Sequence, residues 1–367
     1  MPQLSADFGV SLSAIGYLVT IYAGTMAIGG PLLTVGLLRL SRKNALLFLI
    51  TVFVVGQIIG ALAQGYTSMV VARVITGVSA AAFFGVALTT CAEIVEQKFF
   101  ARAASMVLGG LMVGTVFGLP GATLLGEWFG WRVSFFAVAL IAFVVGLLVI
   151  KMMPSLPAPA EQSTLRTELL AFKSKKLWGI YATSLLLIGA TFAGFTYFVP
   201  ILTTISGFSP ASVPVLLVIY GLATLVGNNI VGRLADKYTI RVIFVGLLLT
   251  IAAMVTFAMW GHSQAVAITA LIIIGLTGVS MNPALVTRGA RVGKNNMLVN
   301  SVHTACIMLG VMVGSWLGGV GIDIGLGLTG ALWIGAALAV FALMTLIPEA
   351  RNFNSSVSSQ PVENRRS

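Results

Sequence analysis

Long apolar runs separated by short polar segments make up most of this chain. Eleven of these runs are near-continuous and about 20 residues long, the length that a helix needs to cross the hydrocarbon core of a bilayer. A membrane β-strand alternates apolar and polar residues instead, and only a helix pairs its backbone groups within one segment in lipid. We therefore predict eleven transmembrane helices. They lie at residues 12–34, 44–65, 69–92, 105–125, 132–153, 177–205, 212–232, 241–260, 264–287, 297–320 and 328–348.

The composition also indicates a membrane protein. Of the 367 residues, 58% are hydrophobic and 8% are charged, whereas an average soluble domain has about 25% charged residues. These values exclude a soluble enzyme, a nucleic-acid-binding domain and a disordered chain. The two cysteines, Cys91 and Cys306, have no Cys or His neighbour at metal-binding spacing, so we expect inert thiols, no metal site and no cofactor.

The basic residues lie almost entirely on one side of the predicted membrane. If successive connections alternate between two faces, one face holds all of the 21 Lys and Arg residues except Arg132, on the other face, and Arg73, within a span. By the positive-inside rule that basic face is cytoplasmic. We expect a multi-pass protein of the cell inner (plasma) membrane with its C-terminus inside and the N-terminus of this chain outside. The net charge of +11 then requires no nucleic-acid partner.

Internal similarity divides the chain into two related parts. Residues 76–79 recur as residues 277–280, and three glycines spaced by four residues recur about 200 positions later. We predict a five-span bundle (1–153), a cytoplasmic linker (154–176), a six-span bundle (177–348) and a cytoplasmic tail expected to be disordered (349–367). Because the run at 177–205 has no counterpart in the first part, we expect one helix of a six-plus-six plan to be missing from the front.

Two groups of basic residues are candidates for a transport mechanism. Arg73 is the one cation well inside a span, where a charge costs at least about 2.5–3.5 kcal/mol; it is either functional or it snorkels to the nearby interface. The second candidate is the loop that contains Gly232, Arg233, Asp236 and Lys237. Asp236, which lies between Arg233 and Lys237, can pair with these bases and lock two helices together in one conformation, or it can simply cap a helix.

Glycines on one helix face are a further candidate. Gly110, Gly114 and Gly118 are spaced by four residues and are followed by Pro120 and Gly121. Small residues at this spacing permit close approach of two helices, and a proline bends a helix. A sliding seam and a fixed structural contact are both compatible with this pattern.

Several polar residues fall at membrane depth and are candidates to line a cavity. His303 can carry a proton, or it can be a hydrogen-bonded packing residue. No carboxylate falls in the middle of a run, which bears on proton coupling. The candidate cavity-lining residues are Tyr197, Asn228, Asn229, Asn282, Asn300 and His303.

Together these motifs resemble the major facilitator superfamily. The segment from Gly232 to Lys237 resembles its loop signature between the second and third helix of a half, and Arg73 with Gly77 resembles its Arg-xxx-Gly signature. Residues 110–121 resemble its glycine- and proline-rich antiporter signature. Residues 118–126 with 129–132 are similar to the arabinose efflux permease group of drug:proton antiporters.

The resemblance implies an all-α membrane protein with a two-bundle fold, working as a monomer without a cofactor. It further implies a small-molecule substrate and a proton as coupling ion. Two departures stand out. Residues 2–11 resemble the external loop after helix one, so that helix is absent from this chain, and the first-half loop signature at residues 36–43 lacks its acid.

The leading hypothesis is proton-coupled efflux of a small sugar-like or drug-like solute by rocking of the two bundles. An uncoupled facilitator or importer stays open, since no mid-span carboxylate is present. A shortened protein that transports nothing, such as a receptor, scaffold or remnant, is the third possibility. No pairing of nucleophile and base suggests an enzyme.

Overall fold

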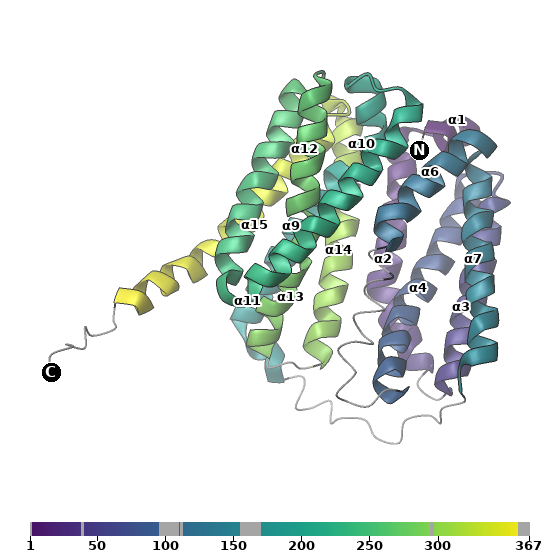
Figure 1. The fold of residues 1–367 in the computed structure, drawn as a ribbon, viewed down its shortest axis with the longest axis horizontal. Helices are drawn as coiled ribbons and strands as arrows, with labels where there is room; N and C mark the ends of the chain where they lie inside the picture. Colours follow the sequence, from purple (N-terminus) through teal and green to yellow (C-terminus); the bar gives the residue numbers. More distant parts are fainter. Residues whose placement is uncertain are drawn as a thin grey trace.

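The computed structural model describes residues 2–37, 40–94, 110, 113–154, 170–293 and 297–358. All regular structure within these residues is helical, and the long helices lie side by side (Figure 1). We call the end that carries α1 (Pro2–Phe8) the α1 end. The opposite end, where α7 ends at Met152 and α9 begins at Lys175, is called the linker end.

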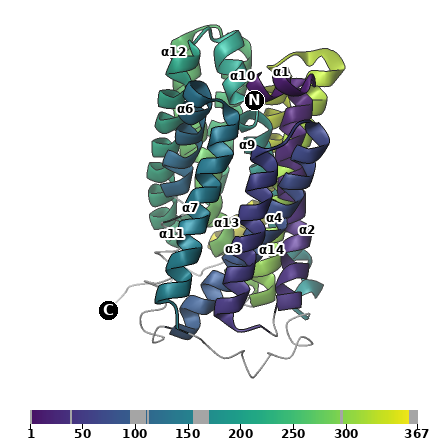
Figure 2. The same cartoon turned by 90° about the vertical axis from the view of Figure 1, so that its right-hand side faces the viewer.

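The helices form two groups that follow the order of the chain. The first group contains α1, α2 (Leu12–Leu37), α3 (Arg42–Ala61), α4 (Tyr66–Ile94), the π-helical turn η2 (Gly114–Gly118), α6 (Leu119–Phe129) and α7 (Trp131–Met152). The second contains η3 (Leu170–Lys173), α9 (Lys175–Phe195), α10 (Phe198–Pro200), η4 (Ile201–Ile205), η5 (Pro210–Ser212), α11 (Val213–Trp260), α12 (Gln264–Thr277), η6 (Val279–Met281), α13 (Asn282–Gly293), α14 (Met297–Gly321), η7 (Ile322–Leu326) and α15 (Gly330–Ser358). The groups meet where α2 packs against α14 and where α6 packs against α11 (Figures 1 and 2).

Nine helical segments in the described part of the chain are long and apolar enough to cross a membrane. Residues 330–346 form a shorter apolar helix, and the predicted run at 105–125 lies partly outside the described residues. The protein is therefore a multi-pass helical membrane protein. The count of eleven spans, their five-plus-six division and the domain limits stay predictions.

Four predicted spans are interrupted or joined differently from what their hydropathy indicates. The runs at 212–232 and 241–260 form one element, α11, with a non-helical residue at Tyr238 (φ −127°, ψ 33°). The run at 264–287 breaks at Gly278 (φ −85°, ψ −107°), between α12 and η6. The run at 177–205 leaves the α-helix after Phe195, shortly before Pro200, which lacks a backbone N–H. Hydropathy alone does not record such breaks in the backbone.

The last helix also differs from the prediction. We expected its span to end at residue 348, whereas α15 continues to Ser358, and its final turns project away from the other helices (Figure 1). Residues 359–367 of the predicted tail lie outside the described residues.

Lys43 joins α3 to the end of α7 at the linker end. Its Nζ donates hydrogen bonds to the carbonyls of Ile150 (2.8 Å) and Met153 (2.7 Å). The last carbonyls of a helix have no intrahelical partner, and a cation there also interacts favourably with the helix dipole. Lys43 of α3 therefore caps the C-terminal end of the neighbouring helix α7.

Candidate functional site

Arg73 lies at a junction of three helices in the first group. It projects from α4, and its Cζ is 5.0 Å from the ring centroid of Phe135 in α7 and 6.0 Å from that of Tyr22 in α2. Its Nε is buried without a hydrogen-bond partner, and no described carboxylate pairs with it. Cation–π contacts offset part of the cost of burying the charge, by about 0.5–2 kcal/mol each. The guanidinium is thus held among aromatic rings rather than neutralised.

Gly77, one turn after Arg73, brings α4 against the same part of α2. A Cβ at Gly77 would lie 2.7 Å from the carbonyl oxygen of Tyr22 and would collide with the hydroxyl of Thr25. The Thr25 hydroxyl donates to the carbonyls of Ile21 (3.0 Å) and Tyr22 (2.9 Å), so it is fixed in place. The segment 22–25 of α2 therefore contacts both residues of the Arg-xxx-Gly pattern.

The two glycine series of the internal repeat have different surroundings. Gly310, Gly314 and Gly318 of α14 pack directly on the backbone of α9: a Cβ at Gly310 would lie 2.5 Å from the Leu185 carbonyl oxygen, and one at Gly318 would lie 2.8 Å from that of Ala193. This is the close approach that four-residue spacing permits.

The first-half copies show no such contact. Nothing described lies within 4 Å of a Cβ placed at Gly110, Gly114, Gly118 or Gly121. Among the described residues, α11 packs beside η2 but does not approach Gly114 or Gly118 as closely as α9 approaches the glycines of α14.

Pro120 coincides with a change in helix type. It is the second residue of α6 and directly follows η2, whose π-helical hydrogen bonding spans Gly114–Gly118. A proline removes one backbone donor, and π-turns are a recognised cause of helix irregularity.

The predicted cavity-lining residues are scattered through the second group. Tyr197 is 0% exposed, and its hydroxyl donates to the Ser315 carbonyl at 3.3 Å. Asn229 is exposed and donates to the Leu225 carbonyl at 2.9 Å, while Asn228 is half-buried. The Oδ1 of Asn282 is buried without a partner, and the side chain of Asn300 lies outside the described ones.

His303 lies in a buried polar contact between α9 and α14. It is 3% exposed, and its Nε2 is 2.8 Å from the Ser184 hydroxyl. Its ring stacks on that of Tyr181, with 5.7 Å between centroids, and the Tyr181 hydroxyl donates to the Val299 carbonyl at 2.8 Å. This environment favours the packing interpretation of His303.

Gly232, Arg233, Asp236 and Lys237, which we expected in a loop, lie within α11, and not all of their side chains are described. Gly232 has open space where a Cβ would lie, and Arg233 is exposed. The side chains of Asp236 and Lys237 lie outside the described ones, so their proposed lock stays a prediction.

Two polar contacts escaped the sequence reasoning. The predicted span at 264–287 places Arg288 in the connection that follows it, but Arg288 is 5% exposed, and its Nη1 donates to the Thr183 hydroxyl at 3.0 Å. Thr183 is in turn 2.7 Å from the Thr345 hydroxyl, so this contact joins α13, α9 and α15. The position of Arg288 at the end of an apolar run is the only sequence signal of this burial.

The second unexpected contact joins the two groups at the α1 end. Asp323 of η7 accepts a hydrogen bond from the Tyr17 hydroxyl (2.8 Å), and its other carboxylate oxygen accepts one from the Ser13 hydroxyl; both donors lie in α2. The partners are 306 and 310 positions away in the sequence, and no spacing rule connects them.

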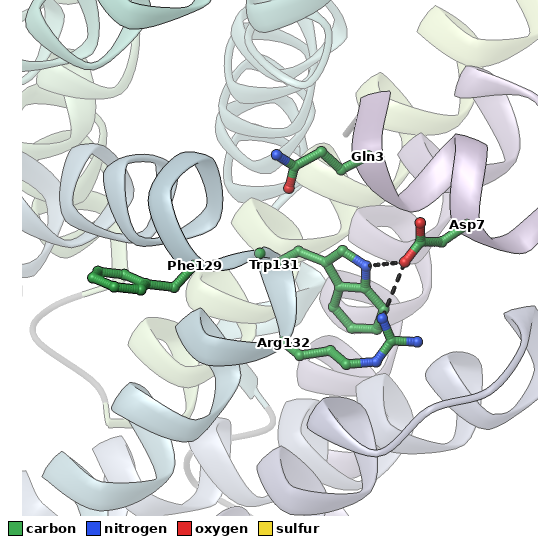
Figure 3. Close-up of a pocket in the computed structure, with 6 residues that line it drawn as sticks. Gln3, Asp7, Phe129, Trp131 and Arg132 are labelled. Carbon is green, nitrogen blue, oxygen red and sulfur yellow. Dashed lines mark hydrogen bonds and ion pairs between the residues drawn. The ribbon is translucent and has the colours of Figure 1, made fainter.

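A second aspartate at the α1 end makes contacts within the first group. The carboxylate of Asp7 accepts hydrogen bonds from Trp131 Nε1 (2.9 Å) and Arg132 Nη1 (3.0 Å), as Figure 3 shows. These two hydrogen bonds, that of Trp131 first, hold the pKa of Asp7 below its ordinary value. An open cavity of about 220 Å³ adjoins the contact; it is lined by Gln3, Asp7, Phe129, Gly130, Trp131 and Arg132.

Long apolar helices in two groups define a multi-pass helical membrane protein. The sequence model of the major facilitator superfamily matches residues 1–296. The chain belongs to this superfamily, as its motifs led us to expect.

Individual relatives cover nearly the whole chain. The chain is 30% identical to a chloramphenicol resistance protein of Streptomyces lividans (95% of this chain, 90% of that protein) and 31% identical to the inner membrane transport protein YdhP of Escherichia coli K12 (96% and 90%). It is 24% identical to a probable sugar efflux transporter of Helicobacter pylori G27 (94% and 88%). The crystal structure of a D-xylose–proton symporter has a similar fold, with a TM-score of 0.75, 18% identity and coverage of 94% and 91%.

Proposed function

We propose that the protein is a secondary active transporter that exports a small sugar-like or drug-like solute in exchange for protons by alternating access. Alternating access requires two groups of helices that close at one end of the molecule while they part at the other. The superfamily and the names of two relatives, a resistance protein and a sugar efflux transporter, support solute export.

The observation that carries the proposal is a change along one face of α2. Toward the α1 end this face touches the second group: a Cβ at Gly24 would lie 2.8 Å from the sulfur of Met312 in α14. Four and eight residues further toward the linker end, Ile28 is 63% exposed and Leu32 is 70% exposed. The face of α2 that contacts the second group nearer the α1 end is thus exposed nearer the linker end, as expected of a carrier that is open at the linker end.

In the proposed mechanism the predicted site residues have separate roles. Arg73 and Gly77 couple α2 to α4, and the glycines from 110 to 121 let helices slide. The segment of α11 that contains Gly232, Arg233, Asp236 and Lys237 locks the linker end. The linker end faces the cytoplasm of the inner membrane, and the protein works as a monomer. Polar side chains between the groups bind the solute.

Transport and its coupling are tested in everted membrane vesicles. We expect uptake of radiolabelled chloramphenicol or of one member of a sugar panel when respiration acidifies the lumen, and its loss when a protonophore is added. Uptake that ignores the protonophore would overturn the proton coupling. Equal uptake by vesicles with and without the protein, across the whole panel, would overturn transport.

An uncoupled facilitator is the second candidate, and one observation favours it. Within the described candidate spans, Asp323 is the single carboxylate, three residues from the end of the span Val302–Leu326. Counterflow that is equally fast with and without a pH gradient would identify a facilitator.

A further inference from the structure

The α1 end of the interface between the two groups is packed without spare room. A Cβ at Gly16 of α2 would collide with the hydroxyl of Tyr197, and one at Gly319 of α14 would lie 2.6 Å from both Tyr17 Cε1 and the Tyr197 hydroxyl. Two glycines, one from each group, thus let two tyrosines sit between α2 and the second group. Such an interface can open only if the contacts that hold it are released.

Asp323 supplies the charged contact across this interface. Each of its two carboxylate oxygens accepts one hydroxyl hydrogen bond from α2, one from Ser13 and one from Tyr17. Hydrogen bonds to an ionised acceptor are about twice as strong as neutral ones. Because both donors lie on one helix and the acceptor lies in the other group, these bonds exist only while the α1 end is closed.

We propose that Asp323, Ser13 and Tyr17 form a latch that holds the α1 end of the transporter closed and sets the proportion of molecules open at that end. Asp323 is a positioning residue in this proposal, since it acts on the solute only through the closure. The inference rests on the alternating access proposed above and adds to it the contact that must break for the α1 end to open.

The location of the latch fits the rest of the structure. On the same helix, the latch residues contact the second group at the α1 end, whereas Ile28 and Leu32, nearer the linker end, are exposed. Asp323 itself is exposed, so a substitution there leaves no cavity in the core. Loss of the carboxylate therefore removes cross-group bonds without unfolding either group.

The test measures opening at both ends with single cysteines. The native cysteines are first removed by the substitutions Cys91→Ser and Cys306→Ala. Thr20→Cys then reports on the α1 end, because Thr20 lies one turn beyond Gly16 and its hydroxyl is buried. Leu32→Cys reports on the linker end. The protein is labelled with a membrane-impermeant maleimide in lipid nanodiscs, where both ends face the reagent and no assumption about orientation is needed.

We expect Asp323→Ala to raise the labelling rate of Thr20→Cys by about threefold to tenfold and to lower that of Leu32→Cys. Tyr17→Phe should act in the same direction. Combining it with Asp323→Ala should add little, because both substitutions break the same bond. General loosening of the fold would raise both labelling rates together, and that result would overturn the latch.

Asp7→Asn is the matched control. Asp7 is also an aspartate at the α1 end with two hydrogen bonds, but its donors, Trp131 and Arg132, belong to its own group. Asp7→Asn should leave the labelling rates of both Thr20→Cys and Leu32→Cys unchanged. The latch is wrong if Asp323→Ala labels like the parent protein, or if Asp7→Asn has the same effect. Labelling requires no solute, so the latch and the proposed export fail independently.

Discussion

The guanidinium of Arg73 lies over the ring of Phe135, with 5.0 Å between Cζ and the ring centroid. The cation belongs to α4 and the ring to α7, and no described carboxylate neutralises the charge. Burying an unpaired cation disfavours folding, so a protein that keeps one has a use for it.

Arg73→Gln should therefore separate transport from stability. We expect solute export to fall by about tenfold or more, equivalent to at least ~1.4 kcal/mol in the transport barrier. The apparent melting temperature should change little, because the lost cation–π contacts are offset by relief of the buried charge. Vesicle uptake and thermal unfolding of the purified protein measure the two effects.

Arg73→Lys is the companion variant. It keeps the charge but not the planar group that stacks on aromatic rings. We expect export between that of the parent and that of Arg73→Gln. Full export by Arg73→Gln would mean that the charge is incidental.

The glycine series yields a prediction of opposite signs at equivalent positions. Gly314→Ala should destabilise the protein by about 1–3 kcal/mol, because its Cβ collides with the backbone of Gly189 in α9. Gly114→Ala should be neutral or stabilise by up to about 1 kcal/mol, since alanine favours the helix and no described atom lies within 4 Å of the added Cβ. The yield of monodisperse protein and its melting temperature compare the two. Equal loss at both positions would show that η2 is also packed.

The class of fold follows from sequence because each apolar run must satisfy its own backbone in lipid. The run at 44–65 and the observed helix Arg42–Ala61 differ by only a few residues. The break at Gly278 was not predictable. It depends on a tertiary contact, since a Cβ there would lie 2.7 Å from both the Ile274 carbonyl oxygen and Thr191 Cγ2 of α9.

The candidate site residues could be predicted only where a local sequence pattern marks them. Four-residue spacing identified Gly310, Gly314 and Gly318 as a contact face, but not α9 as the helix they touch. The pairing of Asp323 with Tyr17 joins positions 306 residues apart and depends on how two groups of helices meet. Nothing local to either residue encodes that register.

Lys43 gives a prediction about the linker end. Lys43→Met should lower stability by about 0.5–1.5 kcal/mol per lost hydrogen bond, because the terminal carbonyls of α7 lose their donor. Lys151→Met is the control, since Lys151 is an exposed lysine in the last turn of the same helix. Melting curves of both variants at equal ionic strength make the comparison. A similar shift in the two would mean that charge alone, and not capping, stabilises this helix end.

From the lowered pKa of Asp7 we predict how the stability of the folded protein depends on pH. Its pKa is lowered in the folded protein by hydrogen bonds from Trp131 and Arg132, so the ionised form stabilises the fold. That contribution is fully present above the ordinary pKa of 3.8 and is lost as the pH falls through the lower value of the folded state. The melting temperature of the parent should therefore exceed that of Asp7→Asn at neutral pH, and the difference should shrink below about pH 4. A difference that stays constant down to pH 3 would mean that the Asp7 carboxylate does not contribute through its charge, and that packing of Trp131 against Phe8 holds this end instead.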